Sequence, residues 1–409
     1  MMKILHTSDW HLGQDFYSYD RTEEHTAFLE QLCEIVSDEQ PDVLIVAGDI
    51  YHNGTPSNTV MRLFTDRLDA VCSACPTMQV VVIAGNHDSS SRLEVNRTLW
   101  LHRQVHIIGR IEKKEGKVDL DHHILPVFNQ MGEKCGYVVA LPHVFLHSFP
   151  LLDEETPYDD RRELFFQALA NRVNEVNTEG LPVVMTAHMA LTGSDITGHD
   201  TVRGGMEYLN VTDLKVPFDY LALGHIHCPQ WLDETTARYC GSPVAVNFDE
   251  RYGHSVTVVE LEKGGEKPVC RYLPIHNPWP LKTLPSKALP FEEMLQELAA
   301  FPDDEQAYIR CQVLLPDVPP QNAQEQVQRV IKEKKCRFCC FKWEHPERTA
   351  TERVQAFDDV EQMKEHSPVE VAGMYYEHRY GHAMDEEMKE LLEQVVREVE
   401  NKEEKRNKA

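Results

Sequence analysis

The chain has 409 residues, 42% hydrophobic and 26% charged, which is typical of a globular protein with two or three domains. Its net charge of −26 argues against general binding of polyanions, because nucleic acid is held by clustered lysine and arginine side chains. No run of 18 apolar residues occurs and the N-terminus leads directly into a predicted strand, so we expect a cytoplasmic protein. The eleven cysteines are an odd number without a secretory signal, so we expect reduced thiols.

The first part of the chain alternates predicted strands and helices. Apolar β-branched runs predict buried strands, and apolar residues at helical spacing predict helices. In chain order, the pattern predicts a strand at 3–8, a helix at 22–39, a strand at 43–47, a helix at 57–72 and a strand at 79–83. Asp20 and Glu23 are placed like a capping box before the first helix. This alternation predicts an α/β layered fold, in which sites lie at the C-terminal edge of the sheet.

The middle of the chain adds further strands and one helix. In chain order, these are a strand pair within 119–141, a helix at 161–176 and buried strands at 183–187 and 220–223. The stretches 239–243, 255–261 and 269–273 predict strands of a second sheet that closes this domain. The turn-rich segment Asn277-Pro-Trp-Pro280 then marks a domain boundary.

A small α/β unit is predicted after this boundary. It comprises a helix at 291–301, a strand at 308–315, a helix at 323–334 and a strand at 336–343. The unit carries the densest basic cluster of the chain, Lys332, Lys334, Lys335, Arg337 and Lys342. A contact with backbone phosphates and a solvated helix face are equally consistent with this cluster. Cys336, Cys339 and Cys340 have half of the spacing of a zinc site, but a strand with small apolar thiols is favoured.

The C-terminal part is predicted to be a linker followed by two helices. Ser367-Pro-Val-Glu370 has the residues of a helix start, and the second helix carries an apolar stripe from Met388 to Val399. A helix pair this small has no core of its own, so the stripe needs either the protein's own body or a partner helix. The predicted division is a domain at 1–276, a small domain at 281–344, a linker at 345–366, a helix–loop–helix at 367–400 and a charged tail at 401–409.

Five predicted strands end in aspartate, asparagine or histidine. The residues concerned are Asp9, His11, Asp49, Asn86, His87, His188, His225 and His227. Such a mixed set of ligands suits Mn, Fe or Zn better than Mg or Ca. Without His87, seven ligands remain, which exceed the needs of one ion, so we expect two ions, bridged by Asp49, that would support in-line displacement at phosphorus. His87 is expected to act as general acid or as donor to the phosphate oxygens, with Asp88 orienting its imidazole.

The order of these motifs resembles that of the calcineurin-like metallophosphoesterases. The matching motifs are Asp9-Trp-His11, Gly48-Asp49, Gly85-Asn-His-Asp88, His188 and Gly224-His-Ile-His227. A narrower resemblance is to the SbcD family, the nuclease subunits of bacterial SbcCD complexes. It rests on the opening 4–13, on Gly48-Asp-Ile-Tyr-His52 with Pro56, on Gly241-Ser-Pro243 and on Tyr375-Tyr-Glu-His-Arg-Tyr-Gly381.

This resemblance implies a metallophosphoesterase β-sandwich flanked by helices, with a small α/β cap and a C-terminal helix pair. It implies that one metal is held by Asp9, His11, Asp49 and His227, and the second by Asp49, Asn86, His188 and His225. His87 would be the catalytic histidine, His52 would lie near the DNA, and Mn²⁺ would be the activator.

The implied activity is that of an ATP-dependent 3′→5′ double-strand exonuclease and a single-strand and hairpin endonuclease in DNA replication, repair and recombination. The cap would face DNA, and the helix pair would dock on the coiled coil of an SbcC-like ATPase. The assembly would be a heterotetramer built on a homodimer, located at the nucleoid and not in a membrane.

One expectation about the partner comes from the residues themselves. The phosphate-binding pattern G-x-x-x-x-G-K-[ST] is absent, because Gly109 and Gly116-Lys117 are wrongly spaced and Val118 replaces the hydroxyl residue. Any ATP dependence must therefore come from another chain. Two other functions stay open: an enzyme of the same fold acting on a phosphoprotein or small phosphodiester, and a non-catalytic scaffold for an ATPase. The scaffold would be marked by a lost ligand or a replaced His87, and neither is seen.

Overall fold

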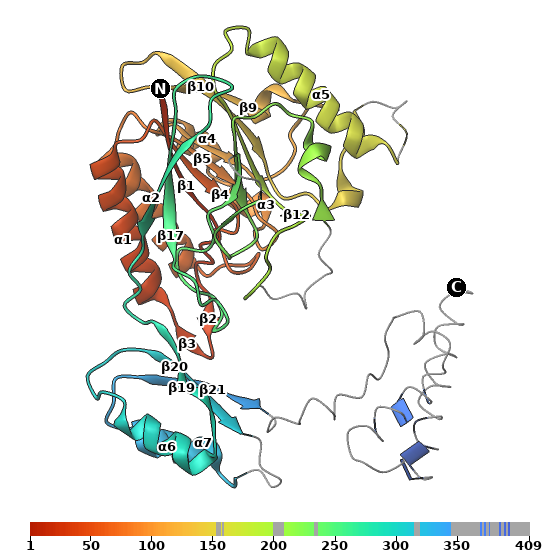
Figure 1. The fold of residues 1–409 in the computed structure, drawn as a ribbon. Helices are drawn as coiled ribbons and strands as arrows, with labels where there is room; N and C mark the ends of the chain where they lie inside the picture. Colours follow the sequence, from red (N-terminus) through yellow and green to blue (C-terminus); the bar gives the residue numbers. More distant parts are fainter. Residues whose placement is uncertain are drawn as a thin grey trace. The chain divides into compact units, whose positions relative to one another are not determined.

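The computed structural model describes residues 1–152, 157, 159–198, 208–232, 236–314 and 320–344, and nine isolated positions between 369 and 392. The predicted linker and nearly all of the predicted helix pair lie outside these residues. A sandwich of two sheets and a smaller three-stranded sheet belong to one compact unit (Figure 1). None of the helices within the described ranges combines the length and apolar character that spanning a bilayer requires.

Two six-stranded sheets form the sandwich. The first has the order β18-β17-β1-β4-β5-β6 and the second the order β15-β16-β14-β11-β10-β9. The strands of the first are β1 (Met2–Thr7), β4 (Val43–Ala47), β5 (Gln79–Ile83), β6 (Val105–Ile108), β17 (Ser255–Leu261) and β18 (Val269–Pro274). Those of the second are β9 (Ile124–Phe128), β10 (Lys134–Leu141), β11 (Val183–His188), β14 (Tyr220–Gly224), β15 (Gln230–Trp231) and β16 (Ala237–Tyr239). The central strands of each sheet are parallel, so their C-terminal ends share one edge.

The prediction for the last strands of the sandwich was wrong in its sheet assignment. Strands β17 and β18 do not join β16 in the second sheet but extend the first sheet, with Met2 opposite Leu261. Because β1 pairs with β4 along only one side, its other side offers unpaired backbone groups, and β17 satisfies them in antiparallel register. The alternating pattern of 255–261 identifies a strand but carries no information about which edge it completes.

Helices cover both outer faces of the sandwich. The helices α1 (Thr22–Glu39) and α2 (Asn58–Ala74) pack on the first sheet, and α5 (Arg161–Val176) packs on the second (Figure 1). Successive residues of a strand face opposite sides. Leu44 and Val46 of β4 accordingly join the core under the helices, whereas Ile45 and Ala47 join the core between the sheets. The predicted bounds of α1, β4, β5 and α5 are confirmed.

The start of α1 differs from the predicted capping box. Its first helical turn follows Arg21, which makes no side-chain cap. Asp20 instead accepts a hydrogen bond from the backbone N–H of Thr22, at 2.9 Å. The carboxylate of Glu23 accepts a hydrogen bond from the indole Nε1–H of Trp279, at 2.8 Å. A tertiary partner thus replaces the local contact that the sequence pattern suggested.

The smaller domain is a three-stranded sheet with two helices. Its elements are β19 (Leu281–Leu289), α6 (Phe291–Ala300), β20 (Tyr308–Leu314), α7 (Ala323–Ile331) and β21 (Arg337–Glu344), with the sheet order β19-β20-β21. Strand β19 was not predicted, and the strand predicted over the cysteine cluster is confirmed as β21. Lys334 and Arg337 of the basic cluster are partly buried and contact other groups of the protein. Lys334 donates to Phe301 O and Asp303 Oδ1, and the guanidinium of Arg337 lies 3.6 Å from the ring centroid of Trp279.

Short elements lie in the loops of the sandwich. They are β2 (Asp15–Phe16), β3 (Tyr19–Asp20), α3 (Ser90–Leu93), α4 (Arg97–Leu101), β7 (Lys113–Lys114), β8 (Lys117–Val118), β12 (Ala190–Leu191) and β13 (Tyr208–Leu209). The loop around β2 and β3 brings Phe16 into a small aromatic core with Phe248, Trp279 and Tyr308. This core attaches the smaller sheet to the sandwich.

Candidate metal centre

The C-terminal ends of five strands converge on one set of polar side chains. The first sheet supplies the turns after β1, β4 and β5, and the second sheet supplies the ends of β11 and β14. His188, at the end of β11 in the second sheet, bonds to the first sheet. Its Nδ1 donates a hydrogen bond to the carbonyl oxygen of Ala47, at the end of β4, at 2.8 Å. The predicted convergence at the sheet edge is therefore seen, and both sheets take part in it.

The backbone at this edge is tightly constrained. Four site residues have a left-handed backbone, with φ of 53° at Asp9, 46° at His11, 51° at Asp49 and 97° at His225. Non-glycine residues rarely adopt this conformation, and it clusters where the surrounding structure imposes it for function. Gly85 is required for a different reason, since a Cβ atom there would lie 2.0 Å from Oδ1 of Asp49. The left-handed backbone of these four residues costs local stability, and it directs their side chains to one site.

One group of possible ligands consists of Asp9, His11 and His227. Their donor atoms lie within 4.8 Å of one another, and all three side chains are buried. Nε2 of His11 is 3.2 Å from Nε2 of His227. Two imidazole nitrogens that face each other at this distance are both satisfied by a cation between them. Asp9 is fixed in place because its carboxylate accepts the backbone N–H of His225, at 3.0 Å.

A second group lies beside the first. Oδ1 of Asn86 is 3.0 Å from Nε2 of His188 and 3.0 Å from Nδ1 of His225. Asp49 stands between the two groups, because its Oδ2 lies 3.4 Å from Nε2 of His188 and 3.7 Å from Nε2 of His11. Asp9 also contributes to a possible group with Asp49 and His188. Carboxylate, imidazole and amide donors of this kind fit divalent transition metals.

The electrostatics of the site favour added positive charge. Burial disfavours a charge on either Asp49 or His188, yet their contact holds the pKa of Asp49 well below its usual range and raises the pKa of His188 to about 9. Burial raises the pKa of Asp9 and lowers that of His11. The buried carboxylates therefore favour a proton on the imidazole of His188. A bound divalent cation would displace that proton. The residues fit the metal ions that the motif order implies.

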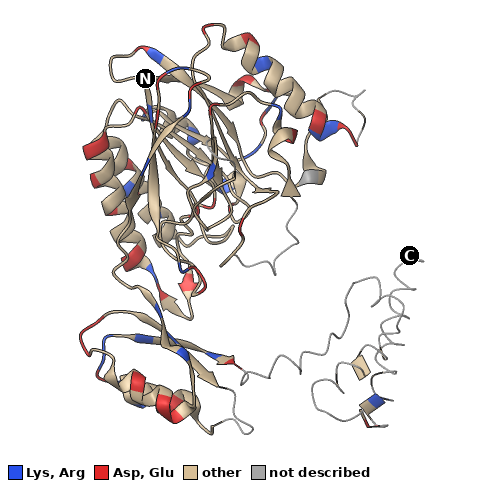
Figure 2. Ribbon diagram, viewed as in Figure 1, with Lys and Arg blue, Asp and Glu red and all other residues tan. Residues whose placement is uncertain are grey.

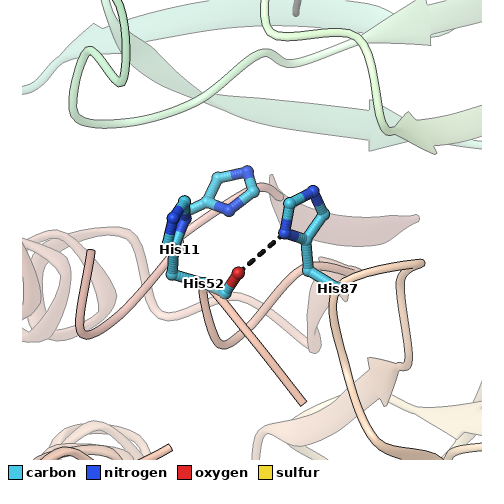
Figure 3. Close-up of side chains that lie close together, drawn as sticks. All are labelled: His11, His52 and His87. Atoms are coloured by element: carbon cyan, nitrogen blue, oxygen red, sulfur yellow. Dashed lines mark hydrogen bonds between the residues drawn. The ribbon is translucent and has the colours of Figure 1, made fainter. Parts of the chain in front are cut away.

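His87 lies at the edge of this group, beside His11 and His52 (Figure 3). Its Nδ1 donates a hydrogen bond to the backbone carbonyl oxygen of His52 at 2.7 Å. Its backbone N–H donates to Oδ1 of Asp49 at 2.9 Å. The three imidazoles of His11, His52 and His87 also lie close enough to form a possible metal group of their own. With Nδ1 engaged, Nε2 is the nitrogen of His87 left for a substrate.

The expectation that Asp88 orients His87 is not what the geometry shows. The carboxylate of Asp88 accepts three backbone N–H groups, from Gly85, Ile50 and Tyr51, at 2.9, 3.1 and 2.9 Å. The carbonyl of His52 takes the orienting position instead. The carboxylate of Asp88 is engaged by N–H groups from both the loop after β4 and the loop after β5, so it bonds these two loops and not the ring of His87. Asp88 therefore ties the loop after β4 to the loop after β5.

Glu250 is a site residue that sequence reasoning missed. Its Oε1 lies 3.0 Å from Nδ1 of His227, and its Oε2 accepts a hydrogen bond from the hydroxyl of Ser242 at 3.0 Å. The carboxylate is buried, and its hydrogen bond raises the pKa of His227 against the effect of burial. Glu250 follows no strand and belongs to no spacing motif, so only the fold reveals it.

Comparison with known proteins identifies the family. Residues 2–229 match the family described as calcineurin-like phosphoesterase, and residues 278–380 match the type 5 capsule protein repressor C-terminal domain. The D subunit of nuclease SbcCD from Rhodobacter capsulatus is 34% identical, covering 74% of this chain and 77% of that protein. Its namesake from Escherichia coli K12 is 31% identical, covering 63% of this chain and 65% of that protein.

Two further similarities complete the comparison. The Bacillus subtilis protein of the same name is 32% identical, covering 65% of this chain and 68% of that protein. A solved dimetal phosphatase from Danio rerio aligns with a TM-score of 0.38 and 12% identity, covering 68% of this chain and 97% of that one. The motif order, the sandwich and the sequence identity together show that the chain belongs to the calcineurin-like phosphoesterases and, within them, to the SbcD family of nuclease subunits.

Proposed function

We propose that this protein is the nuclease subunit of an SbcCD-like complex and hydrolyses phosphodiester bonds of DNA with two divalent metal ions. The observation that carries the proposal is the position of Asp49. One oxygen of its carboxylate faces both Nε2 of His188, at 3.4 Å, and Nε2 of His11, at 3.7 Å. A carboxylate between two groups of ligands is what a pair of bridged ions needs.

The proposed ligands divide into two sets that share Asp49. One ion would take Asp9, His11, Asp49 and His227, and the other Asp49, Asn86, His188 and His225. The imidazoles of His188 and His227 are oriented through Nδ1 by Ala47 O and Glu250, so Nε2 of each would be the nitrogen that binds an ion. We propose Mn²⁺ as the activating ion because the donor set mixes nitrogen and oxygen.

The protein's own residues would supply orientation and a proton. Bound divalent ions would lower the pKa of a water and neutralise charge on the scissile phosphate. His87 already donates Nδ1–H to the carbonyl of His52, so its imidazolium form presents Nε2–H to the phosphate or leaving oxygen. The ring of His52 lies 5.7 Å from that of His87, centroid to centroid, and we propose that it contacts the DNA backbone. Asp88 would hold the loop after β4 and the loop after β5 in place for this proton transfer.

The wider assignment extends the proposal along the chain. The nuclease domain would be residues 1–276 and the DNA-facing cap residues 281–344. After a linker at 345–366, the helix pair at 367–400 would dock on the coiled coil of an SbcC-like ATPase, in a heterotetramer containing two copies of this chain. The complex would act in the cytoplasm, at the nucleoid. Its proposed activities are ATP-dependent 3′→5′ exonuclease cleavage of duplexes and endonuclease cleavage of single strands and hairpins.

One experiment separates this function from its competitors. End-labelled hairpin DNA is incubated with the chain and Mn²⁺, with and without the ATPase partner and ATP. The proposal predicts Mn²⁺-dependent cleavage that the partner and ATP extend to duplex ends. Hydrolysis of bis(p-nitrophenyl) phosphate without any DNA cleavage would identify a phosphoesterase of the same fold with another substrate. Neither activity, together with a retained ATPase complex, would identify a non-catalytic scaffold.

A further inference from the structure

We propose that a pocket beside the metal centre binds an unpaired nucleobase and its attached phosphate in the strand that is being cut. The pocket has a volume of about 420 Å³. Its lining includes Asn86 and Asp88 on the side of the metal centre, and His143, Phe145, Arg110 and Lys113. The inference rests on the nuclease function proposed above and identifies where the substrate strand would be held.

A series of aromatic rings leads from the metal centre to this pocket. The ring of His143 stacks on that of the proposed ligand His225, with centroids 6.3 Å apart and planes 27° apart. Phe145 meets His143 edge-on at 4.9 Å, and His147 stacks on Phe145 at 5.7 Å. Phe145 is 55% exposed although it lines a pocket. A large exposed aromatic ring in this position offers a face on which a base can stack.

His143 is firmly placed at the inner end of the series. Its Nδ1 donates to the carbonyl oxygen of His188 at 3.1 Å, and its backbone N–H donates to the carbonyl oxygen of Ala84 at 2.8 Å. His143 is thereby attached to His188 at the end of β11 and to the turn after β5, which carries the proposed ligand Asn86. A base in the pocket would therefore be held at a defined position relative to the reacting phosphate.

Cations line the outer side of the same pocket. The side chain of Arg110 is 60% exposed, and its Nε lies 3.4 Å from the carboxylate of Glu94. That carboxylate also accepts the backbone N–H of Gly109 at 2.9 Å, which anchors the loop that presents Arg110. Lys113 begins the β7–β8 hairpin, in which Lys114 and Lys117 are also exposed. These cations are suited to the phosphate groups next to a stacked base.

The charge distribution of the rest of the chain makes the cations at the pocket important for binding a polyanion. Acidic side chains recur along α1, and the chain as a whole has a net charge of −26 (Figure 2). In the smaller domain, the basic cluster that the sequence singled out has Lys334 and Arg337 bound to protein groups. Arg110 and Lys113, in contrast, lie beside the proposed reaction site. Local positive charge is what a strongly acidic protein needs in order to hold a polyanion there.

The pocket is large enough for a single nucleotide. Sites for small organic ligands span about 300–1,000 Å³, so about 420 Å³ accommodates one nucleotide. A base can enter only after leaving the duplex stack, which is least costly at frayed ends, loops and single strands. The pocket would therefore favour unpaired nucleotides next to the bond that is cut.

Two substitutions at Phe145 test the inference. In the 409-residue chain with Mn²⁺, Phe145→Ala should raise the KM for a single-stranded oligonucleotide about 5- to 150-fold, the loss expected for one stacked base. Phe145→Trp should keep a low KM, and its added fluorescence should be quenched by the single strand but not by blunt duplex. The matched control is Phe128→Ala, because Phe128 is 40% exposed and lies at the opposite end of the sandwich, bonded through its N–H to Gln79.

The cations are tested by salt dependence. Arg110→Gln with Lys113→Gln should reduce the slope of log binding constant against log salt by about 0.7 for each phosphate that is no longer neutralised. The control pair Lys263→Gln and Lys267→Gln, both exposed in the β17–β18 turn, should leave the slope unchanged. An unaltered KM in Phe145→Ala, or no quenching in Phe145→Trp, would overturn the pocket while leaving the nuclease function intact. If the unaltered chain neither binds nor cleaves DNA, the proposed function fails and the pocket inference fails with it.

Discussion

Glu250 lies with its Oε1 3.0 Å from Nδ1 of His227, and both side chains are buried. A carboxylate in this position fixes the tautomer and ring orientation of a metal-binding imidazole. Removing its charge is expected to weaken Mn²⁺ binding without touching any proposed ligand.

Glu250→Gln should lower the affinity for the Mn²⁺ proposed to bind His227 by about 10- to 100-fold, as is usual for residues that orient a ligand. Isothermal titration of the metal-free protein with Mn²⁺ measures this directly. Glu262→Gln, at an exposed position, is the matched control and should bind Mn²⁺ like the unaltered chain. Equal affinities in the two variants would show that Glu250 has only a packing role.

His87→Ala should reduce Mn²⁺-dependent DNA cleavage by about 10²- to 10⁴-fold, the usual contribution of a positioned general acid. Its Nε2 is not among the proposed ligand atoms, so the metal content should stay near two ions per chain. Cleavage assays and elemental analysis of the same preparation check both statements. His102→Ala removes an exposed imidazole elsewhere and serves as control. Loss of one metal ion would instead assign His87 to the group with His11 and His52.

Arg337→Met should destabilise the attachment of the small domain to the sandwich. The guanidinium lies 3.6 Å from the Trp279 ring centroid and donates to the hydroxyl of Tyr308 at 3.0 Å. Removal of a desolvated cation–π interaction should lower the free energy of unfolding by about 2 kcal/mol, measured by urea denaturation. Arg329→Met, whose side chain is 79% exposed on α7, should have little effect. Equal free energies of unfolding for Arg337→Met and Arg329→Met would show that this interaction does not stabilise the contact between the two domains.

Glu39→Gln should remove a pH-dependent part of the stability. Hydrogen bonds from Arg271 and Lys3 lower the pKa of Glu39 from its usual 4.5 to about 2. A lowered carboxyl pKa stabilises the folded state above pH 4.5, and this contribution is lost as the pH falls towards 2. Because Arg271 is half exposed, we expect about 1 kcal/mol at neutral pH.

The measurement for Glu39 is the free energy of unfolding as a function of pH. The difference between Glu39→Gln and the unaltered chain should be largest near neutral pH and shrink as the medium is acidified. Asp38→Asn changes an exposed carboxylate on the same helical turn and is the control. A difference that stays constant with pH would attribute the effect to packing and not to charge.

Deleting residues 367–409 should abolish co-purification with the SbcC-like ATPase and leave Mn²⁺-dependent phosphodiesterase activity in place. The expected reason is that the apolar stripe from Met388 to Val399 is the docking face. Deleting only residues 401–409 removes the charged tail and should retain the complex. Persistent co-purification of the longer deletion would place the interface elsewhere in the chain.

Many of the strands and the long helices were predictable from the sequence alone because their signals are local, whereas β6 and β19 were not predicted. The apolar run of β4 and the helical spacing of α1 depend only on neighbouring residues, and both elements have the predicted bounds. The candidate ligands were predictable for a related reason. Parallel strands align their C-terminal ends, so residues just after several such strands must meet at one edge.

The partners of those residues depended on contacts between distant segments. Glu250 reaches His227 across 23 residues, the carbonyl of His52 replaces Asp88 beside His87 across 35, and β17 completes the edge left open by β1. Arg337 and Lys334, which the sequence placed in a basic cluster, make internal contacts for the same reason. Sequence by itself determined which residues stand at the strand ends, because periodicity is a local property. Tertiary structure alone decided what each of them contacts, because burial and hydrogen-bond geometry arise only when remote segments pack together.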